Sequence, residues 1–189
     1  KAGGGFSRIV DVDGTDWVQF NGSADVDYPD GAASGFRGVP NLVFRSEDGG
    51  AGHPGFDQCV SEMLDDKTIL TKSKSGNWQW RWTFYNDHAR MSMEKTDPEH
   101  AYWFLYEGPV AGKFKPARQY WGTDTEGPRF ESPSLNEGEH VAGTWQWAYF
   151  GDTTVNRVFF TAQQNPDSLT DYFAYMGSTD EANDAPDGM

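Results

Sequence analysis

Two stretches of the chain repeat the same residues in the same order, and this internal repeat limits the fold more than any other feature. Gly76-Asn77-Trp78-Gln79-Trp80 recurs as Gly143-Thr144-Trp145-Gln146-Trp147. The two copies span 76–108 and 143–177, and both end in an aromatic run followed by glycine. Each copy contains three strand-like segments separated by turn residues, which predicts a three-stranded meander. Two related meanders favour a pair of facing sheets, or two halves of one large sheet.

The rest of the chain also favours strands over helices. Its candidate strands are short, aromatic or β-branched, and bounded by Gly, Asn, Asp and Pro, whereas helical periodicity is almost absent. We expect strands at residues 8–12, 17–20, 42–44, 68–74, 78–85, 90–95, 101–107, 144–150, 157–162 and 172–176. Many short strands separated by turns predict an all-β fold, an antiparallel β-sandwich containing the two meanders. The span 21–67 holds only 42–44 as a clear strand and is expected to be irregular.

Length and the repeat together predict one domain. A chain of 189 residues suits a single domain with a substantial core, which we place at residues 1–177. Residues 178–189 have no apolar pattern and include four acidic residues. We expect them to form an acidic tail that is mobile or docks elsewhere.

Charge excludes several classes of partner. The chain has 15 Lys and Arg against 29 Asp and Glu, a formal net charge of −14. Such a chain is repelled by phosphate backbones and anionic lipids, so we expect no nucleic-acid partner. No apolar run approaches the ~20 residues of a spanning helix, so no membrane insertion is expected. The start at Lys1 resembles a trimmed terminus, and the single Cys59 forms no intrachain disulfide framework. The acidic composition, the single cysteine and the many tryptophans and tyrosines also fit an exported protein, and we expect a secreted, extracellular protein.

The first copy of the repeat carries a polar sheet face. Side chains alternate between the two faces of a strand, so Trp78, Trp80 and Trp82 share one face. Pairing with the next strand brings these tryptophans together with methionines in a core. The opposite face then carries Gln79, Arg81, Arg90, Ser92 and Glu94. Such a face either forms ion pairs in solvent or hydrogen-bonds sugar hydroxyls and carboxylates, for which arginine is well suited.

Aromatic side chains on the third strand of this copy complete the candidate glycan site. Tyr102, Trp103 and Tyr106 could cover the apolar C–H face of a pyranose ring. The alternative for each is a place in the aromatic core. The sequence thus predicts a glycan site made of Gln79, Arg81, Arg90, Glu94, Tyr102, Trp103 and Tyr106.

A turn near the beginning of the chain has the composition of a calcium site. Asp11, Asp13 and Asp16 place three carboxylates around Gly14, and hard cations such as Ca²⁺ favour clustered oxygen ligands. The EF-hand pattern is incomplete, and an ordinary Asp-Gly turn is the alternative. The sequence contains no HExxH motif, no GxSxG motif and no Walker loop.

Three segments resemble a known group of proteins. The segments 78–84 and 101–108, together with the glycine-rich opening 3–17, resemble secreted bacterial β-sandwich domains of the concanavalin-like or jelly-roll type. Such domains accompany polysaccharide-degrading enzymes. The resemblance implies a jelly-roll or concanavalin-like sandwich and a carbohydrate partner outside the cell.

These observations lead to three functional hypotheses. The first is a lectin-like module that binds a glycan without catalysis. The second is a self-assembling subunit of an extracellular filament, tube or surface layer, because a contact that does not close produces a polymer. The third is a polysaccharide lyase or glycoside hydrolase using Arg81, Glu94 and an aromatic hydroxyl, with His88 as a further candidate. Glycosidases need two carboxyl groups, and Glu94 and Glu107 are the pair to compare.

Overall fold

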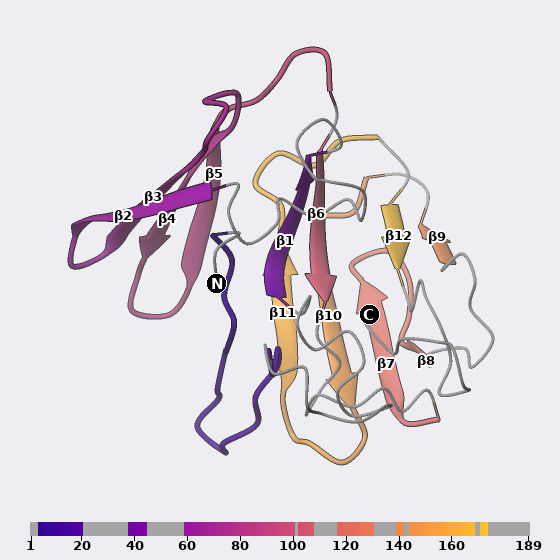
Figure 1. Ribbon diagram of the computed structural model, residues 1–189. Coiled ribbons are helices and arrows are strands. Elements are labelled where there is room, and N and C mark those ends of the chain that lie inside the picture. Colours follow the sequence, from indigo (N-terminus) through magenta and orange to yellow (C-terminus); the bar gives the residue numbers. More distant parts are fainter. Residues whose placement is uncertain are drawn as a thin grey trace, which may run out of the picture. The chain divides into compact units, whose positions relative to one another are not determined.

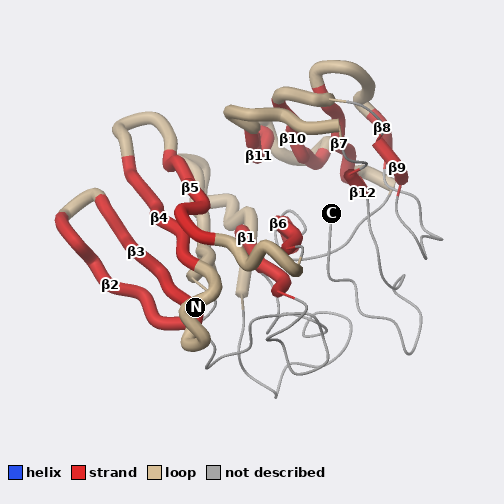
Figure 2. Tube along the Cα trace, turned by 90° about the horizontal axis from the view of Figure 1, so that it is seen from above, coloured by secondary structure: helices blue, strands red, loops and turns tan. Residues whose placement is uncertain are grey.

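A computed structural model shows that the chain is all-β, as predicted. The structure describes residues 4–20, 38–44, 59–100, 102–107, 117–130, 139–141, 144–168 and 171–173. All regular elements in these ranges are strands, and Figures 1 and 2 show no helix among them. Accordingly, none of the described ranges provides a helix that could cross a membrane.

The first four-stranded sheet is an antiparallel meander with the order β2-β3-β4-β5 (Figure 1). Its strands are β2 (Cys59–Asp65), β3 (Thr68–Ser73), β4 (Gln79–Phe84) and β5 (Ala89–Lys95). The β3–β4 turn forms because Gly76 adopts φ +77°, a left-handed conformation that favours glycine. In the same turn the hydroxyl of Ser73 accepts a hydrogen bond from the Trp78 N–H at 3.1 Å. Gly76 begins the repeated motif, and the left-handed backbone conformation of this turn explains why a glycine stands there.

The second four-stranded sheet has the order β11-β10-β7-β8 and is also antiparallel. Its strands are β7 (Gln119–Thr123), β8 (Arg129–Phe130), β10 (Trp147–Asp152) and β11 (Val158–Ala162). The turn after β7 resembles the turn after β3. Here the hydroxyl of Thr123 accepts hydrogen bonds from the N–H groups of Thr125 and Glu126, both at 3.1 Å. A hydroxyl at the end of a strand thus organises the next turn in both sheets.

The remaining strands correct the prediction of two three-stranded meanders. They are β1 (Gly38–Phe44), β6 (Tyr102–Glu107), β9 (Glu139–Val141) and β12 (Asp171–Phe173). The first two strands of each copy form a hairpin, β4-β5 or β10-β11, as expected. The third strand leaves that hairpin in both copies, because β6 pairs with β1 and β12 pairs with β9. The repeat therefore describes a hairpin followed by a strand that joins a separate two-stranded sheet.

The chain divides into two compact units. The first consists of Lys1–Phe6 and Val39–Leu105 and contains the sheet β2-β3-β4-β5. The second consists of Ser7–Gly38 and Tyr106–Met189 and contains the sheet β11-β10-β7-β8. The single domain at 1–177 remains a prediction, and the tail at 178–189 lies outside the described residues.

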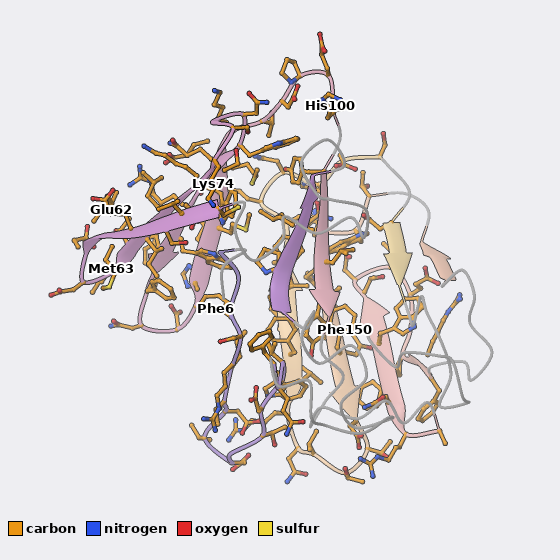
Figure 3. All side chains as sticks on the ribbon, viewed as in Figure 1. Phe6, Glu62, Met63, Lys74, His100 and Phe150 are labelled. Carbon is orange, nitrogen blue, oxygen red and sulfur yellow. The ribbon has the colours of Figure 1, made fainter. Side chains whose placement is uncertain are left out.

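Tryptophans of the repeat form the core of the first unit, which confirms the predicted faces of β4. Trp78, Trp80 and Trp82 are buried and pack with Leu42 and Cys59. Register places Met93 beside Trp80 and Met91 beside Trp82. Met91, Met93 and Phe6 are partly buried and pack against this cluster. Phe6 is labelled in Figure 3. Tryptophan and methionine therefore share one side of the sheet, because side chains alternate between faces on both strands and the register pairs Trp80 and Trp82 each with a methionine.

A second aromatic core lies in the other unit. Trp121 and Phe150 are buried and face each other across the β7–β10 ladder. Tyr106 contacts Phe150 with a centroid distance of 5.1 Å, and Trp17 contacts Phe159 at 6.4 Å. Phe150 is labelled in Figure 3. Residues before β1 and residues at the end of β6 thus contribute to one core.

The strand predictions were wrong in two respects. The expected strands at 8–12 and 17–20 reduce to a single bridge between Val10 and Asp16, because side-chain hydrogen bonds of aspartate organise this segment instead. Strands β2, β7, β8 and β9 were not predicted. β2 is almost entirely exposed, so it lacks the alternation that marks a half-buried strand, and it lies within the span expected to be irregular.

Candidate functional site

The structure brings together three of the predicted glycan-binding residues. A bulge between Gln79 and Trp80 allows Glu94 to reach both neighbours on β4. Its carboxylate accepts hydrogen bonds from Gln79 Nε2 at 2.6 Å and from Arg81 Nε at 2.5 Å. The hydrogen bond from Arg81, followed by that from Gln79, lowers the pKa of Glu94. Both carboxylate oxygens thus already have protein donors, as in an ion-paired sheet face.

The other predicted residues lie in different surroundings. Arg90 is on the same face, opposite Thr83, and its guanidinium lies 5.9 Å from the centre of the Tyr85 ring. Tyr102 is partly exposed and contacts Trp78 edge to face at 5.8 Å. The side chain of Trp103 lies outside the described part of the structure.

Tyr106 has the surroundings of a core residue. Its ring is buried between aromatic neighbours, and its hydroxyl donates a hydrogen bond to the carbonyl oxygen of Trp17 at 2.6 Å. Burial raises the pKa of this hydroxyl, so it stays protonated. The aromatic-core alternative accounts for Tyr106, whose ring offers no open face to a sugar.

The geometry of the described residues gives little support to the proposed catalytic set. A general acid needs a raised pKa, whereas Glu94 has a lowered one. His88 lies in the β4–β5 turn, where it stacks on Tyr85 and contacts Asp87 at 2.8 Å. The side chain of Glu107 lies outside the described part, so its separation from Glu94 stays untested.

The three aspartates of the predicted calcium site bind protein donors. Asp11 accepts hydrogen bonds from the N–H groups of Asp13 and Thr15 and from Trp17 Nε1. Asp16 accepts three backbone N–H groups, from Ile9, Val18 and Gln19. Asp13 pairs with Arg157 at 2.7 Å. Among the described residues no group of three or more His, Cys, Asp or Glu side chains could hold a metal ion. Calcium binding therefore stays a prediction.

The structure contains an aromatic surface that the sequence prediction did not include. It lies on the face of the sheet β11-β10-β7-β8 opposite the buried Trp121 and Phe150, because side chains alternate between faces. We name it the aromatic face, and it consists of Phe130, Tyr120, Tyr149, Trp147 and Phe160. Neighbouring rings along this row have centroid distances of 6.3, 6.4, 6.1 and 5.9 Å. The row crosses all four strands, from β8 to β11.

Two glycines explain how the tyrosines of this face lie. Tyr149 is opposite Gly122, and Tyr120 is opposite Gly151. A Cβ atom on Gly122 would lie 2.4–2.8 Å from the Tyr149 ring and hydroxyl, and one on Gly151 would lie 2.5–2.8 Å from Tyr120. Each ring therefore occupies the space that a side chain would fill on the adjacent strand. The two rings are inclined to each other at 67°, so they contact edge to face across the ladder.

An open hollow adjoins the aromatic face. Tyr120 and Val158, which belong to that face of the sheet, line it together with Val155, Asn156 and Arg157 from the β10–β11 turn. The hollow thus places amide and guanidinium groups beside the row of rings. Such groups can hydrogen-bond hydroxyls of a molecule that lies on the rings.

The repeat did not indicate that Trp147 is exposed. Trp147 matches Trp80 in the motif, and the sequence predicted a core position for Trp80. Trp80 is 0% exposed, whereas Trp147 is 37% exposed. The alternation in β10 contained the signal: Trp147 and Tyr149 share one side, and Ala148 and Phe150 share the other.

Comparisons with protein-family models, with curated protein sequences and with solved structures give no match to this chain.

Proposed function

We propose that this protein is an extracellular, lectin-like module that binds a glycan on its aromatic face, without catalysis. The observation that supports the proposal is the row of five neighbouring rings on one face of β11-β10-β7-β8. Aromatic rings cover the apolar C–H face of a pyranose, and several neighbouring rings on one sheet face offer more than one such contact along a sugar chain. The jelly-roll or concanavalin-like sandwich implied by the resemblance belongs to the same proposal.

The ligand expected on this face is a neutral polysaccharide. The net charge of −14 disfavours strongly anionic chains. The row crosses four strands, so it suits several consecutive sugar units of a long chain better than a single terminal sugar. Asn156 and Arg157 at the adjoining hollow can hydrogen-bond sugar hydroxyls at one position along that chain.

The polar face of the first unit supports the proposal less well. Glu94 already uses both carboxylate oxygens within the protein, through Arg81 and Gln79. A sugar would have to replace these hydrogen bonds and would gain little net free energy. We therefore assign glycan binding to the aromatic face.

The test is binding of the purified protein to a panel of neutral and acidic polysaccharides, by pull-down and calorimetry. Trp147→Ala and Phe160→Ala each remove an exposed ring, and we expect affinity to fall about two- to thirteenfold, from about 0.5–1.5 kcal/mol per ring contact. Tyr85→Ala is the matched control, because Tyr85 is an exposed aromatic residue of the other unit.

Three results would contradict the proposal. The wild type could bind no member of the panel, the Tyr85 variant could lose as much affinity as the Trp147 variant, or the protein could release new reducing or unsaturated ends. The last result would favour the lyase or hydrolase alternative.

A further inference from the structure

The two outer strands of the first sheet form complementary surfaces. β2 and β5 are the edges of the sheet β2-β3-β4-β5, and each has seven residues. Within the described part of the chain neither strand pairs on its outer side. An open edge presents backbone N–H and C=O groups that can pair with another strand.

β2 is unusually apolar for an exposed edge. Val60 is 61% exposed and Met63 is 68% exposed, and Leu64 is also exposed. Figure 3 shows Glu62 and Met63 on this outer strand. Proteins commonly protect an edge with lysine or proline, and β2 has neither.

Charge determines which edges fit together. β2 carries Glu62 and Asp65 and no basic residue, whereas β5 carries Arg90 and Lys95 with one acidic residue, Glu94. Two β2 strands would repel each other, and so would the cations of two β5 strands. Pairing of β2 with β5 places opposite charges together.

Topology allows this pairing in a single orientation. Four consecutive antiparallel strands leave β2 and β5 running in opposite directions. A second copy in the same orientation can therefore add its β5 beside β2 and continue an antiparallel sheet. Such a head-to-tail contact does not close, so further copies can add.

We propose that the chain associates with further copies of itself through β2 of one copy and β5 of the next, which produces an open filament. This inference is independent of the proposed glycan site, which lies on the other unit. Continuous strand spacing predicts a rise of about 19 Å per copy and a rotation of about 80–100°. Moderate salt should favour association by screening the long-range repulsion between chains of net charge −14, whereas high salt also screens the attraction between the two edges.

The test uses the full chain at increasing concentration and salt, with light scattering and electron microscopy. Val60→Lys with Met63→Lys should keep the protein monomeric under conditions in which the wild type forms filaments. Val12→Lys is the control, because Val12 is an exposed valine of the other unit and the substitution also adds a positive charge. Circular dichroism shows whether each variant is folded.

Mixing two variants, each with one blocked edge, distinguishes a head-to-tail contact from a symmetric one. Arg90→Glu with Lys95→Glu blocks the β5 edge, and this variant alone should also be monomeric. Mixed with the Val60, Met63 variant, it should associate again, because each variant retains the unmodified edge that the other lacks. Dimers of the β5 variant alone, a wild type that stays monomeric at every concentration and salt, or filaments with a different rise would each overturn the proposal.

Discussion

Asp152 at the end of β10 is the buried charge that holds the β10–β11 turn. Its carboxylate accepts hydrogen bonds from Arg118 Nε at 2.8 Å, from the Thr154 N–H at 2.8 Å and from the Thr154 hydroxyl at 2.7 Å. Asp152→Ala would remove the acceptor of donors that water can partly reach, and we expect the free energy of unfolding to fall by about 1–2 kcal/mol. Urea unfolding measures this change. Asp87→Ala, at an exposed ion pair, should change stability by less than about 0.5 kcal/mol; equal effects would contradict the prediction.

Glu94, also at the scale of single residues, makes a pH-dependent contribution to the free energy of unfolding. Arg81 and Gln79 hold its pKa below the unfolded value of about 4.3. The unfolded chain therefore binds more protons in this range, so the contribution to stability is present above the unfolded pKa. It disappears as pH falls through the lower folded pKa.

The test compares wild type with Glu94→Gln by urea unfolding between pH 7 and pH 3. We expect the wild type to be more stable at pH 7 and the difference to shrink as the pH falls through that range. A difference that stays constant with pH would show that the Glu94 charge does not stabilise the fold.

At the scale of strands, the pairs of tyrosine and glycine connect β7 with β10. Gly122→Ala places a Cβ atom against the Tyr149 ring, so the ring must move. We expect a loss of about 1–3 kcal/mol in stability and weaker glycan binding. Combining it with Tyr149→Ala should restore part of that loss, because the obstructing ring is then absent. Additive losses in unfolding experiments would contradict the contact.

The sequence predicted β4 well because three independent signals agreed. Trp78, Trp80 and Trp82 alternate, Met91 and Met93 alternate on the next strand, and turn residues separate the two strands. The polar pair of Arg81 and Glu94 follows from the same alternation. Here the local pattern was enough to predict which face of the strand is buried.

The same reasoning failed in β10 for a physical reason. The letters Trp-Gln-Trp occur in both copies, yet Trp147 is exposed because Ala148 and Phe150 face the core instead. Which face is buried depends on what packs against the sheet, and that information lies elsewhere in the chain. Likewise, the partners of β6 and β12 are distant in sequence, so no local pattern could assign them.

At the scale of the whole molecule, net charge makes stability depend on salt. A net charge of −14 on 189 residues makes the folded chain repel itself more strongly than the expanded chain does. We expect the melting temperature to rise by several degrees when sodium chloride increases from low millimolar to about 0.5 M, where the Debye length is below about 8 Å. Calorimetry over a series of sodium chloride concentrations measures this. A melting temperature independent of salt would contradict the prediction.

The exposure of Trp147 has an optical consequence. Among the tryptophans whose side chains the structure describes, Trp17, Trp78, Trp80, Trp82, Trp121 and Trp145 are buried, and Trp147 alone is exposed. A water-soluble quencher such as acrylamide should therefore remove preferentially the red-shifted part of the native emission, which comes from Trp147. The protein thus contains its own fluorescent reporter on the aromatic face. A ligand that covers this ring should protect its emission and shift it to the blue, and Trp147→Phe should abolish both effects.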